Sequence, residues 1–197
     1  MVIVKLGGSL FNSRLLPNWL DKLATLSHRE SIIIVPGGGP FADQIRQAQQ
    51  QHNIDDAHAH HMALLAMSQF GLLLLGLCDQ SIPLYYPTQA PFKAPENMLS
   101  IWLPDNNLLK EKQIRQNWET TSDSLALWLA QQLKPKKLTL LKHQIQRYNS
   151  IQTLSKIGTL DLTFPKQYND TEIVTELFDV SQITDYSLAL PKQALVL

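Results

Sequence analysis

The sequence predicts an α/β fold, a three-layer α/β/α sandwich around a central, mostly parallel open sheet. Two apolar runs, 2–6 and 31–35, have the continuous β-branched character of strands that are buried on both faces. Between them, residues 17–26 place apolar side chains at helical spacing, with Pro17 near the expected helix start. Strand, helix and strand in this order form a βαβ unit, which requires a parallel sheet.

The rest of the chain continues the alternation of helices and strands. We expect helices at 41–51, 57–77, 122–133 and 151–156, and strands at 98–103, 138–141 and near 173 and 188. Residues 82–102 are rich in proline and are expected to form loops with short strands. No repeat or linker interrupts the pattern, so we expect residues 1–197 to form a single domain.

Composition and charge exclude several classes of protein. The chain is 44% hydrophobic and 17% charged, a globular balance, and its net charge is zero, which gives no general attraction to nucleic acid. The longest apolar stretch, 70–78, is too short to cross a bilayer, so we expect no membrane partner. The single cysteine, Cys78, excludes an internal disulfide, and no signal peptide precedes the first strand. These features predict a cytoplasmic protein.

Five of the eight glycines lie in two clusters, each directly after an expected strand and before a helix. The first is Gly7-Gly8 in the segment 5–9, and the second is the run 37–39 between two prolines. Glycine lets backbone N–H groups approach a ligand, and the start of a helix favours an anion. Two such loops after neighbouring parallel strands would face one crevice, so we interpret them as phosphate-binding loops. The alternative is a pair of tight turns.

Lys5 adds a second clue. It lies one residue before the end of a buried strand and two residues before Gly7. An unpaired ammonium group is costly to bury, and a phosphate at the loop would stabilise it. The alternative is a lysine that extends to the surface.

These segments together resemble a known family. The segments 5–9 and 35–40, followed by Thr121-Ser122-Asp123-Ser124 at a helix start and a strand that ends at Lys142, resemble the amino acid kinase family. Its members include acetylglutamate, aspartate and uridylate kinases. The resemblance covers about residues 1–142 and implies an amino-acid-kinase-like domain, ATP as phosphoryl donor, Mg²⁺, and a homo-oligomer, dimer or larger. The Asp-Gly pair that members often carry after the corresponding strand is absent here.

The resemblance also implies roles for individual residues. Lys5, Asp123 and Lys142 would be catalytic, with Asp123 orienting the two lysines. The expected ATP-binding residues are Lys5, Gly7, Gly8, Ser9, Ser122, Asp123 and Lys142. No metal-ligating protein residues are expected, because Mg²⁺ would be held mostly by phosphates and water. For Asp123, a simple role as an acidic residue in the first turn of its helix stays open.

A closer likeness concerns the acceptor. The segments 37–43 and 118–124, with Arg46 and Ala59-His60, resemble the aminomethylfuran-phosphate kinases of methanofuran biosynthesis and their relatives in methylotrophic bacteria. This implies a kinase in one-carbon cofactor synthesis that converts a small anionic substrate, a phosphate monoester, into a diphosphate. The expected substrate-binding residues are Gly37, Gly38, Gly39, Arg46 and His60. The alternatives are a kinase of a carboxylate or nucleoside monophosphate, and a non-catalytic nucleotide- or oxyanion-binding relative.

Other conspicuous residues are given plainer interpretations. His58, His60 and His61 are not accompanied by a nearby cysteine or a completing carboxylate, so we do not expect a metal site there. Trp118 and Trp128 are expected to be core residues. Arg46 could bind the acceptor with its two-pronged guanidinium, or it could be a solvated helix residue.

Overall fold

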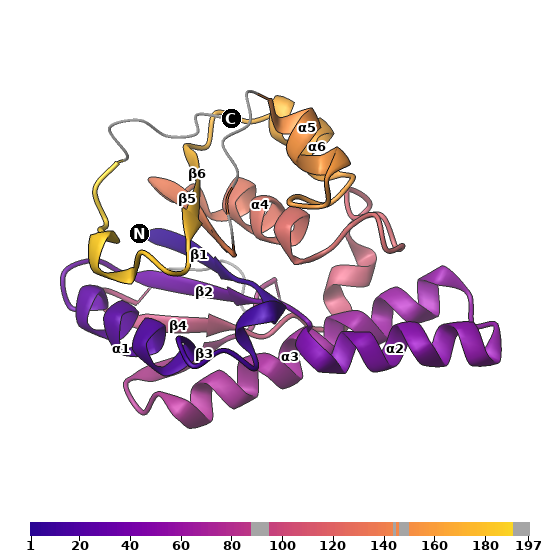
Figure 1. The fold of residues 1–197 in the computed structure, drawn as a ribbon, viewed down its shortest axis with the longest axis horizontal. Helices are drawn as coiled ribbons and strands as arrows, with labels where there is room; N and C mark the ends of the chain where they lie inside the picture. The colour runs from indigo at the N-terminus through magenta and orange to yellow at the C-terminus, as the bar shows by residue number, and fades with distance from the viewer. Residues whose placement is uncertain (88–94, 144, 146–149, 191–197) are drawn as a thin grey trace.

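The computed structural model describes residues 1–87, 95–143, 145 and 150–190, and is built on a six-stranded sheet (Figure 1). The strands are β1 (Val2–Leu6), β2 (Ile32–Pro36), β3 (Ser81–Leu84), β4 (Leu99–Trp102), β5 (Lys137–Lys142) and β6 (Thr175–Asp179). They lie in the order β3-β4-β2-β1-β5-β6, and every neighbouring pair is parallel. The predicted open parallel sheet is confirmed.

Helices cover both faces of the sheet. They are α1 (Leu16–Ser27), α2 (Gly39–His52), α3 (Asp56–Leu77), α4 (Ser122–Leu133), α5 (Ile151–Lys156) and α6 (Phe164–Asn169), with short 3₁₀ turns η1 (Gly8–Leu10), η2 (Asn106–Lys110) and η3 (Ile183–Asp185). The helices α1 and α3 share one hydrophobic core with the sheet, and α4, α5 and α6 share most of the other. This is the predicted three-layer arrangement.

Alternation along β1 decides where its one charged residue points. Val2, Val4 and Leu6 belong to the core beneath α1 and α3, whereas Ile3 belongs to the core beneath α4. Successive side chains of a strand point to opposite faces. Lys5 therefore lies on the same face as Ile3 and is directed toward α4.

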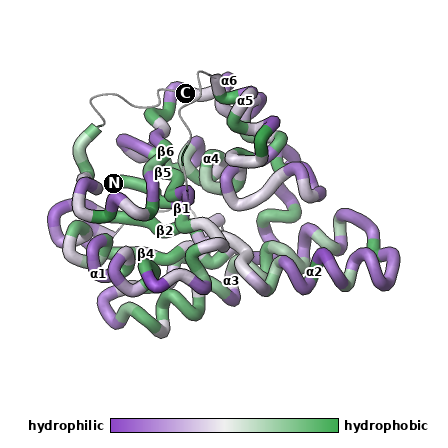
Figure 2. The backbone as a smooth tube through the Cα atoms, viewed as in Figure 1, coloured by the Kyte–Doolittle hydropathy of each residue, from purple (hydrophilic) through white to green (hydrophobic). Residues whose placement is uncertain are grey.

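The α2–α3 hairpin extends to one side of the sheet. Its turn uses Asn53 in the left-handed region, with φ of 52°, and Asp55 caps α3 by accepting a hydrogen bond from the backbone N–H of His58. Figure 2 shows the hydrophilic character of the projecting end of α2 and the hydrophobic strands at the centre.

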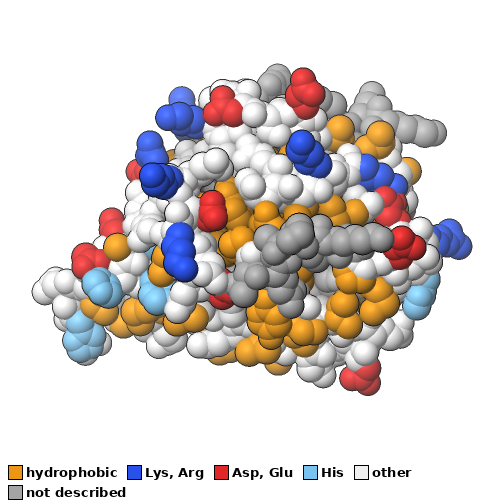
Figure 3. Space-filling model, turned by 180° about the vertical axis from the view of Figure 1, so that it is seen from behind, with side chains coloured by type: hydrophobic (Ala, Val, Ile, Leu, Met, Phe, Trp, Pro, Cys, Tyr) orange, Lys and Arg blue, Asp and Glu red, His pale blue; other side chains and the backbone are white. Residues whose placement is uncertain are grey.

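Helix α3 has the length and hydropathy of a membrane span, but it is placed here as a core helix that contacts β2 and β4. It also leaves Leu65, Leu72 and Leu77 exposed. Figure 3 shows the molecule from behind, with exposed hydrophobic side chains in its middle and lower part, and Lys and Arg side chains dispersed among Asp and Glu.

The C-terminal third differs from the expectation. Leu188 is not in a strand, because a side chain, and not a neighbouring strand, bonds the backbone there. The buried Lys137 ammonium donates to the carbonyl oxygens of Ser187 and Ala189, both at 2.9 Å, and to Glu176 Oε1 at 2.6 Å. Helix α6 was not expected, and residues 88–94 of the expected proline-rich loop lie outside the described residues. In the described part of that segment, Pro83 lies on the edge strand β3, where a missing N–H is tolerated.

Candidate active site

Three adjacent strands end together at the edge of the sheet that carries the candidate site. Leu6 of β1 is in register with Pro36 of β2 on one side and with Leu141 of β5 on the other. The two glycine loops and Lys142 therefore meet at the carboxyl ends of β2, β1 and β5. The prediction that both loops follow neighbouring parallel strands is confirmed.

At this edge two lysines share one carboxylate. Lys5 Nζ lies 2.9 Å from Asp123 Oδ1, and Lys142 Nζ lies 2.6 Å from Asp123 Oδ2. The side chains of Lys5 and Asp123 are 7% and 5% exposed, so Lys5 does not extend to the surface. The Lys142 contact is a hydrogen bond, whereas the Lys5 contact is a close ion pair without hydrogen-bond alignment.

The charges in this Lys5–Asp123–Lys142 triad do not cancel. Burial would raise the pKa of Asp123, but Lys142 and Lys5 outweigh it and lower the pKa to about 2. For Lys142, burial lowers the pKa and so does Lys5, against the opposing pull of Asp123. Two buried ammonium groups and one carboxylate leave an excess positive charge, and an anion such as a phosphate would balance it.

A distant carboxylate positions Asp123. The N-cap of α4, Thr121, makes no side-chain capping bond of its own. Instead Asp161 Oδ2 accepts hydrogen bonds from the backbone N–H groups of Thr121 and Ser124, at 2.8 and 3.0 Å. Because Asp161 caps the helix, the role of Asp123 is not limited to that of a first-turn acid. Sequence reasoning missed Asp161, since nothing local marks a cap supplied from 40 residues away.

Burial of Asp161 raises its pKa, and the charge of nearby Asp123 raises it further. Six N–H and O–H donors bond to its two oxygens; they come from Thr121, Ser124, Thr163 and Phe164. All the hydrogen bonds of this carboxylate are therefore made around the start of α4, and it acts on Lys142 only through its charge, which raises the pKa of Lys142. The ammonium groups of the two lysines are left to bond another anion.

The glycines of the two loops have different tasks. A Cβ on Gly8 would lie 2.5 Å from the Gly39 nitrogen, and one on Gly37 would lie 2.3 Å from the Gly8 nitrogen. The two loops thus touch backbone to backbone, which only glycine allows at these positions. A Cβ on Gly7 would meet nothing closer than 3.5 Å, and Lys5 Nζ is among those nearest atoms. Gly7 therefore faces the space beside the lysines.

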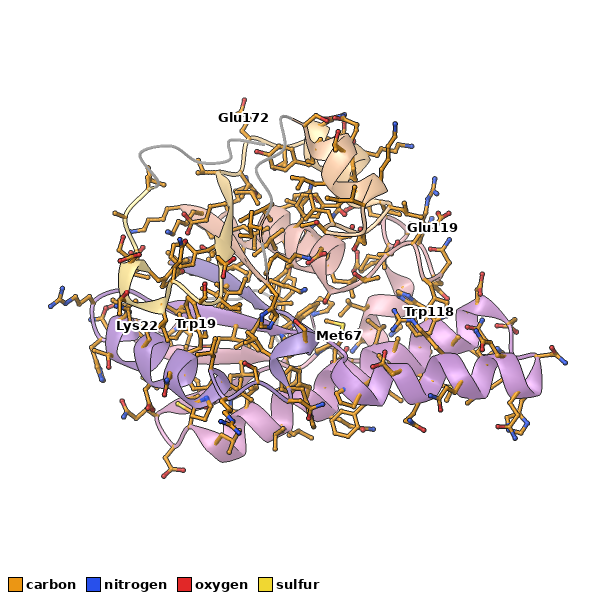
Figure 4. All side chains as sticks on the ribbon, viewed as in Figure 1. Trp19, Lys22, Met67, Trp118, Glu119 and Glu172 are labelled. Carbon is orange, nitrogen blue, oxygen red and sulfur yellow. The ribbon has the colours of Figure 1, made fainter. Side chains whose placement is uncertain are left out.

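A cavity of about 420 Å³ adjoins the glycine loops. Gly8 and Gly38 line one side, and a stripe of α3 lines another: His60, Ala63, Leu64 and Met67. Spacings of three and four residues place these side chains on one face of the helix. Figure 4 shows Met67 and Trp118, two of the lining residues, in the space between the α2–α3 hairpin and the segment before α4. The size suits a small molecule.

At the mouth of the cavity, Arg46 stacks on Trp118. Its guanidinium carbon lies 4.2 Å from the ring centroid, and Nη1 donates to Asp43 at 3.1 Å. Arg46 is 47% exposed, so it is not a fully solvated helix residue. The expectation that Trp118 is a core residue is wrong, because the ring lines the cavity and carries this arginine; Trp128 does lie in the core, stacked with Trp102.

His60 lies in the cavity wall and is 4% exposed. Burial lowers the pKa of His60, and Nε2 has no hydrogen-bond partner among the described residues. The neighbouring histidines point elsewhere: His58 pairs with Asp55, and His61 Nε2 lies 2.6 Å from Asn106 Oδ1. The structure thus brings His60, the glycine loops and Arg46 to one cavity.

A larger cavity, of about 920 Å³, lies between α4, α6 and residues 170–174. No residue of the Lys5–Asp123–Lys142 triad lines either cavity, but the smaller one is lined by Gly8, Gly38 and Gly39 of the glycine loops, whereas the larger one is lined by none of them. We therefore place the candidate site at the smaller cavity. Across the described residues, no group of three or more His, Cys, Asp or Glu side chains is arranged to hold a metal ion.

Comparisons with known proteins agree with this geometry. Residues 1–85 match the model of the amino acid kinase family. Over 143 residues the chain is 29% identical to the [5-(aminomethyl)furan-3-yl]methyl phosphate kinase of Methanocaldococcus jannaschii, an alignment that covers 71% of this chain and 64% of that protein.

Two solved structures share the fold at low sequence identity. Uridylate kinase from Archaeoglobus fulgidus has a TM-score of 0.66 at 13% identity, covering 94% of this chain and 96% of that one. Aspartate kinase from Synechocystis has a TM-score of 0.63 at 15% identity, covering 92% of this chain and 38% of that one.

Proposed function

We propose that the chain is a kinase of the amino acid kinase family and that it transfers the γ-phosphoryl group of ATP to a small phosphate monoester, which becomes a diphosphate. The aminomethylfuran phosphate acceptor named for the Methanocaldococcus relative is the leading candidate, which would place the chain in methanofuran-type cofactor synthesis. We further propose that it acts in the cytoplasm as a homo-oligomer.

The observation that carries the proposal is the excess positive charge of the triad. Lys5 and Lys142 are both buried against one carboxylate at the carboxyl ends of β1 and β5. Phosphoryl transfer depends on positioning and on neutralising charge that develops on phosphate oxygens, and two oriented ammonium groups supply both. A Cβ on Gly7 would lie 3.5 Å from Lys5 Nζ, so the glycine would let the phosphates approach that charge more closely than another residue would.

The donor would supply the transferable phosphoryl group, and Mg²⁺ would be held through its phosphates. Lys5 and Lys142 would bind the oxygens of that group, with Asp123 fixing their directions. The acceptor phosphate is already anionic at neutral pH, so no residue needs to remove a proton from it. This fits a site in which the buried carboxylate, Asp123, is already paired with two lysines.

The cavity suits the acceptor. Helix α2 begins at Gly39 without a side-chain cap, so its first N–H groups are free to bind an anion from the cavity side. Arg46, at the mouth, has guanidinium N–H groups beyond the one that bonds Asp43. The wall of Ala63, Leu64 and Met67 suits the apolar part of a small ester. The acceptor would thus place its phosphate near the glycine loops and Arg46.

The test is a panel of phosphate esters, carboxylic acids and nucleoside monophosphates, incubated with the full chain and MgATP and followed by phosphorus NMR. We expect new diphosphate signals from the aminomethylfuran phosphate. Formation of an acyl phosphate, or turnover of a nucleoside monophosphate alone, would contradict the proposed acceptor but would leave the kinase activity standing. Absence of ADP formation with every acceptor would favour a non-catalytic nucleotide- or oxyanion-binding role.

A pair of lysine variants tests the site itself. Lys5→Ala should reduce kcat by about 10²–10³-fold, the scale for losing one group that stabilises transition-state charge. Lys110→Ala is the control, because Lys110 is exposed and bonds Asn107 away from the site. Equal loss in both variants, or none in Lys5→Ala, would remove Lys5 from the mechanism.

A further inference from the structure

Trp118 lines the smaller cavity but has no role in the mechanism proposed above. Its ring lies between the α2–α3 hairpin and the segment before α4 (Figure 4). The guanidinium carbon of Arg46 lies over this ring, 4.2 Å from the centroid. Because Arg46 is proposed to bind the acceptor phosphate, whatever fixes this arginine also affects how the acceptor is recognised.

The contact with the ring holds the charge of Arg46 without using up a hydrogen bond. An aromatic face attracts a cation through its quadrupole, so the attraction depends on no particular N–H group. Asp43, in contrast, accepts a hydrogen bond from Nη1 at 3.1 Å, and this is the one hydrogen bond that Arg46 makes to the described residues. The ring can therefore keep the guanidinium in place and leave its other N–H groups to a phosphate.

Trp118 is in turn fixed by a side chain of α2. Its Nε1 donates to Gln49 Oε1, and Gln49 Nε2 donates to Asp56 Oδ1 at 2.8 Å. The direction of both bonds follows from the chemistry of the end groups, because an indole N–H can only donate and a carboxylate can only accept. The amide of Gln49 has one orientation that satisfies both partners. Asp56, Gln49 and Trp118 thus form a chain of hydrogen bonds that ends at the ring beneath Arg46.

The spacing on α2 lets one helix hold the ring at two points. Arg46 and Gln49 are three residues apart, so they are neighbours on one face of the helix. Arg46 contacts the face of the indole ring, and Gln49 bonds the nitrogen at its edge.

The backbone that follows Trp118 is held by other contacts. The Glu119 carbonyl accepts a hydrogen bond from the backbone N–H of Thr163 at 3.2 Å, and the N–H of Thr121 donates to Asp161 at 2.8 Å. The start of α4 is therefore fixed independently of the indole ring. Loss of the ring should release Arg46 and leave α4 in place.

We infer that Trp118 is a positioning residue, which holds the Arg46 guanidinium at the cavity for the acceptor phosphate, and that Gln49 holds Trp118 in turn. The inference rests on the proposed function for the phosphate that Arg46 binds. Arg46 is 47% exposed, and without the ring its long side chain would be free to adopt many rotamers. Binding would then have to order the side chain, which lowers affinity for the acceptor but does not affect the transfer step.

Calorimetric binding to the full chain without ATP tests the inference, with [5-(aminomethyl)furan-3-yl]methyl phosphate as the probe. Trp118→Leu should weaken binding by about 2- to 30-fold, the range for loss of a cation–π contact. Trp118→Phe keeps an aromatic face and should lose less. Gln49→Leu, which frees the ring, should weaken binding by about 2- to 10-fold. Gln51→Leu is the matched control on α2, because Gln51 is exposed, and it should bind like the wild type.

An Arg46→Ala background separates a positioning role from direct contact with the acceptor. Once the guanidinium is absent, Trp118→Leu should have no further effect on affinity, because the two residues act as one unit. An equal loss in both backgrounds would mean that the ring contacts the acceptor itself, and would overturn the inference. Unchanged affinity in Trp118→Leu, or no binding by the wild type, would overturn it as well.

Folding of the variants is checked by thermal unfolding. Trp118 is only partly buried, so we expect its variants to fold. If Trp118→Leu does not fold, Trp118→Phe and Gln49→Leu decide the question, and wild-type affinity in both would overturn the inference.

Turnover distinguishes this inference from the proposed function. In Trp118→Leu the acceptor KM should rise while kcat and the KM for ATP stay unchanged, and a lower kcat with unchanged acceptor affinity would instead indicate an effect on α4. If the wild type binds the ester but forms no diphosphate, the proposed function fails and the affinity ratios still support the role of Trp118. If diphosphate forms and the affinity ratios are all near one, the proposed function stands and the inference is wrong.

Discussion

Replacing Gly8 by alanine tests whether the two glycine loops are held together by direct backbone contact. The added Cβ would lie 2.5 Å from the nitrogen and 2.8 Å from the Cα of Gly39. Both atoms belong to backbone at the start of α2, so no flexible side chain can yield. An ordinary contact of about 3.5–4 Å requires the loops to separate by about 1 Å.

Overpacking of this kind typically costs about 1–3 kcal/mol. For a chain of about 200 residues, that corresponds to a decrease in Tm of roughly 2–12 °C. Gly7→Ala is the matched control, since its Cβ would meet nothing nearer than 3.5 Å. That variant should melt like the wild type, yet lose MgATP binding because the methyl group occupies the space beside Lys5.

Thermal unfolding with and without millimolar MgATP measures both effects. The wild type should gain stability from the nucleotide by linkage, Gly8→Ala should start from a lower Tm, and Gly7→Ala should show a normal Tm with little gain. If Gly8→Ala is as stable as the wild type, the close packing of the loops is refuted. If Gly7→Ala binds MgATP normally, Gly7 does not face the phosphates.

Three further variants probe the triad, its support and the binding of the acceptor. Asp123→Asn should lower the free energy of unfolding by about 2 kcal/mol, the value of shifting a carboxyl pKa from 3.8 to about 2, which urea unfolding measures. It should lower kcat less than Lys5→Ala does, because Asp123 orients the lysines and does not itself contact the phosphate, and ADP release measures this loss. The pKa of Asp123 is lowered in the folded protein, so its contribution to the free energy of unfolding is complete above about pH 4 and is lost as the pH falls toward 2. Over this pH range, the stability of the wild type should therefore fall more steeply than that of Asp123→Asn. Asp161→Asn removes one of the two oxygens that accept hydrogen bonds at the start of α4, and should lower the free energy of unfolding by about 1–2 kcal/mol. It should also lower kcat and leave the KM for the acceptor unchanged. A raised acceptor KM with a normal kcat would contradict its role in positioning Asp123. Arg46→Lys should raise KM for the acceptor but not for ATP, and unchanged acceptor KM would place the phosphate elsewhere.

Much of the sheet and the parts of the site that follow its strands could be predicted from the sequence. The apolar runs that became β1 and β2 end in glycine clusters, and parallel neighbours must end at one edge, so the meeting of the loops follows from local patterns. Helix α4 begins at Ser122 and ends at Leu133, as its leucine spacing indicated.

What escaped prediction depends on contacts between distant segments. The stacking of Arg46 on Trp118 joins α2 to a loop 72 positions along the chain, and no spacing rule connects them. The carboxylate that caps α4 comes from Asp161, 40 residues along the chain from Thr121, and no local pattern marks it. The catalytic and binding roles of the site residues stay predictions until the variants are measured.

The buried ammonium of Lys137 gives the last described stretch of the chain a structural task. Two of the three oxygens that receive its hydrogen bonds come from Ser187 and Ala189. A protein shortened to end at Tyr186 would lose both and would leave Lys137 with one hydrogen-bond partner, Glu176, beside the Tyr186 ring, so the charge would be poorly solvated. Lys137 is the first residue of β5, and Lys142 is the last residue of the same strand. Residues 187–189 thus hold the start of the strand that places Lys142 in the site, and proteolysis before them should loosen the site from a distance.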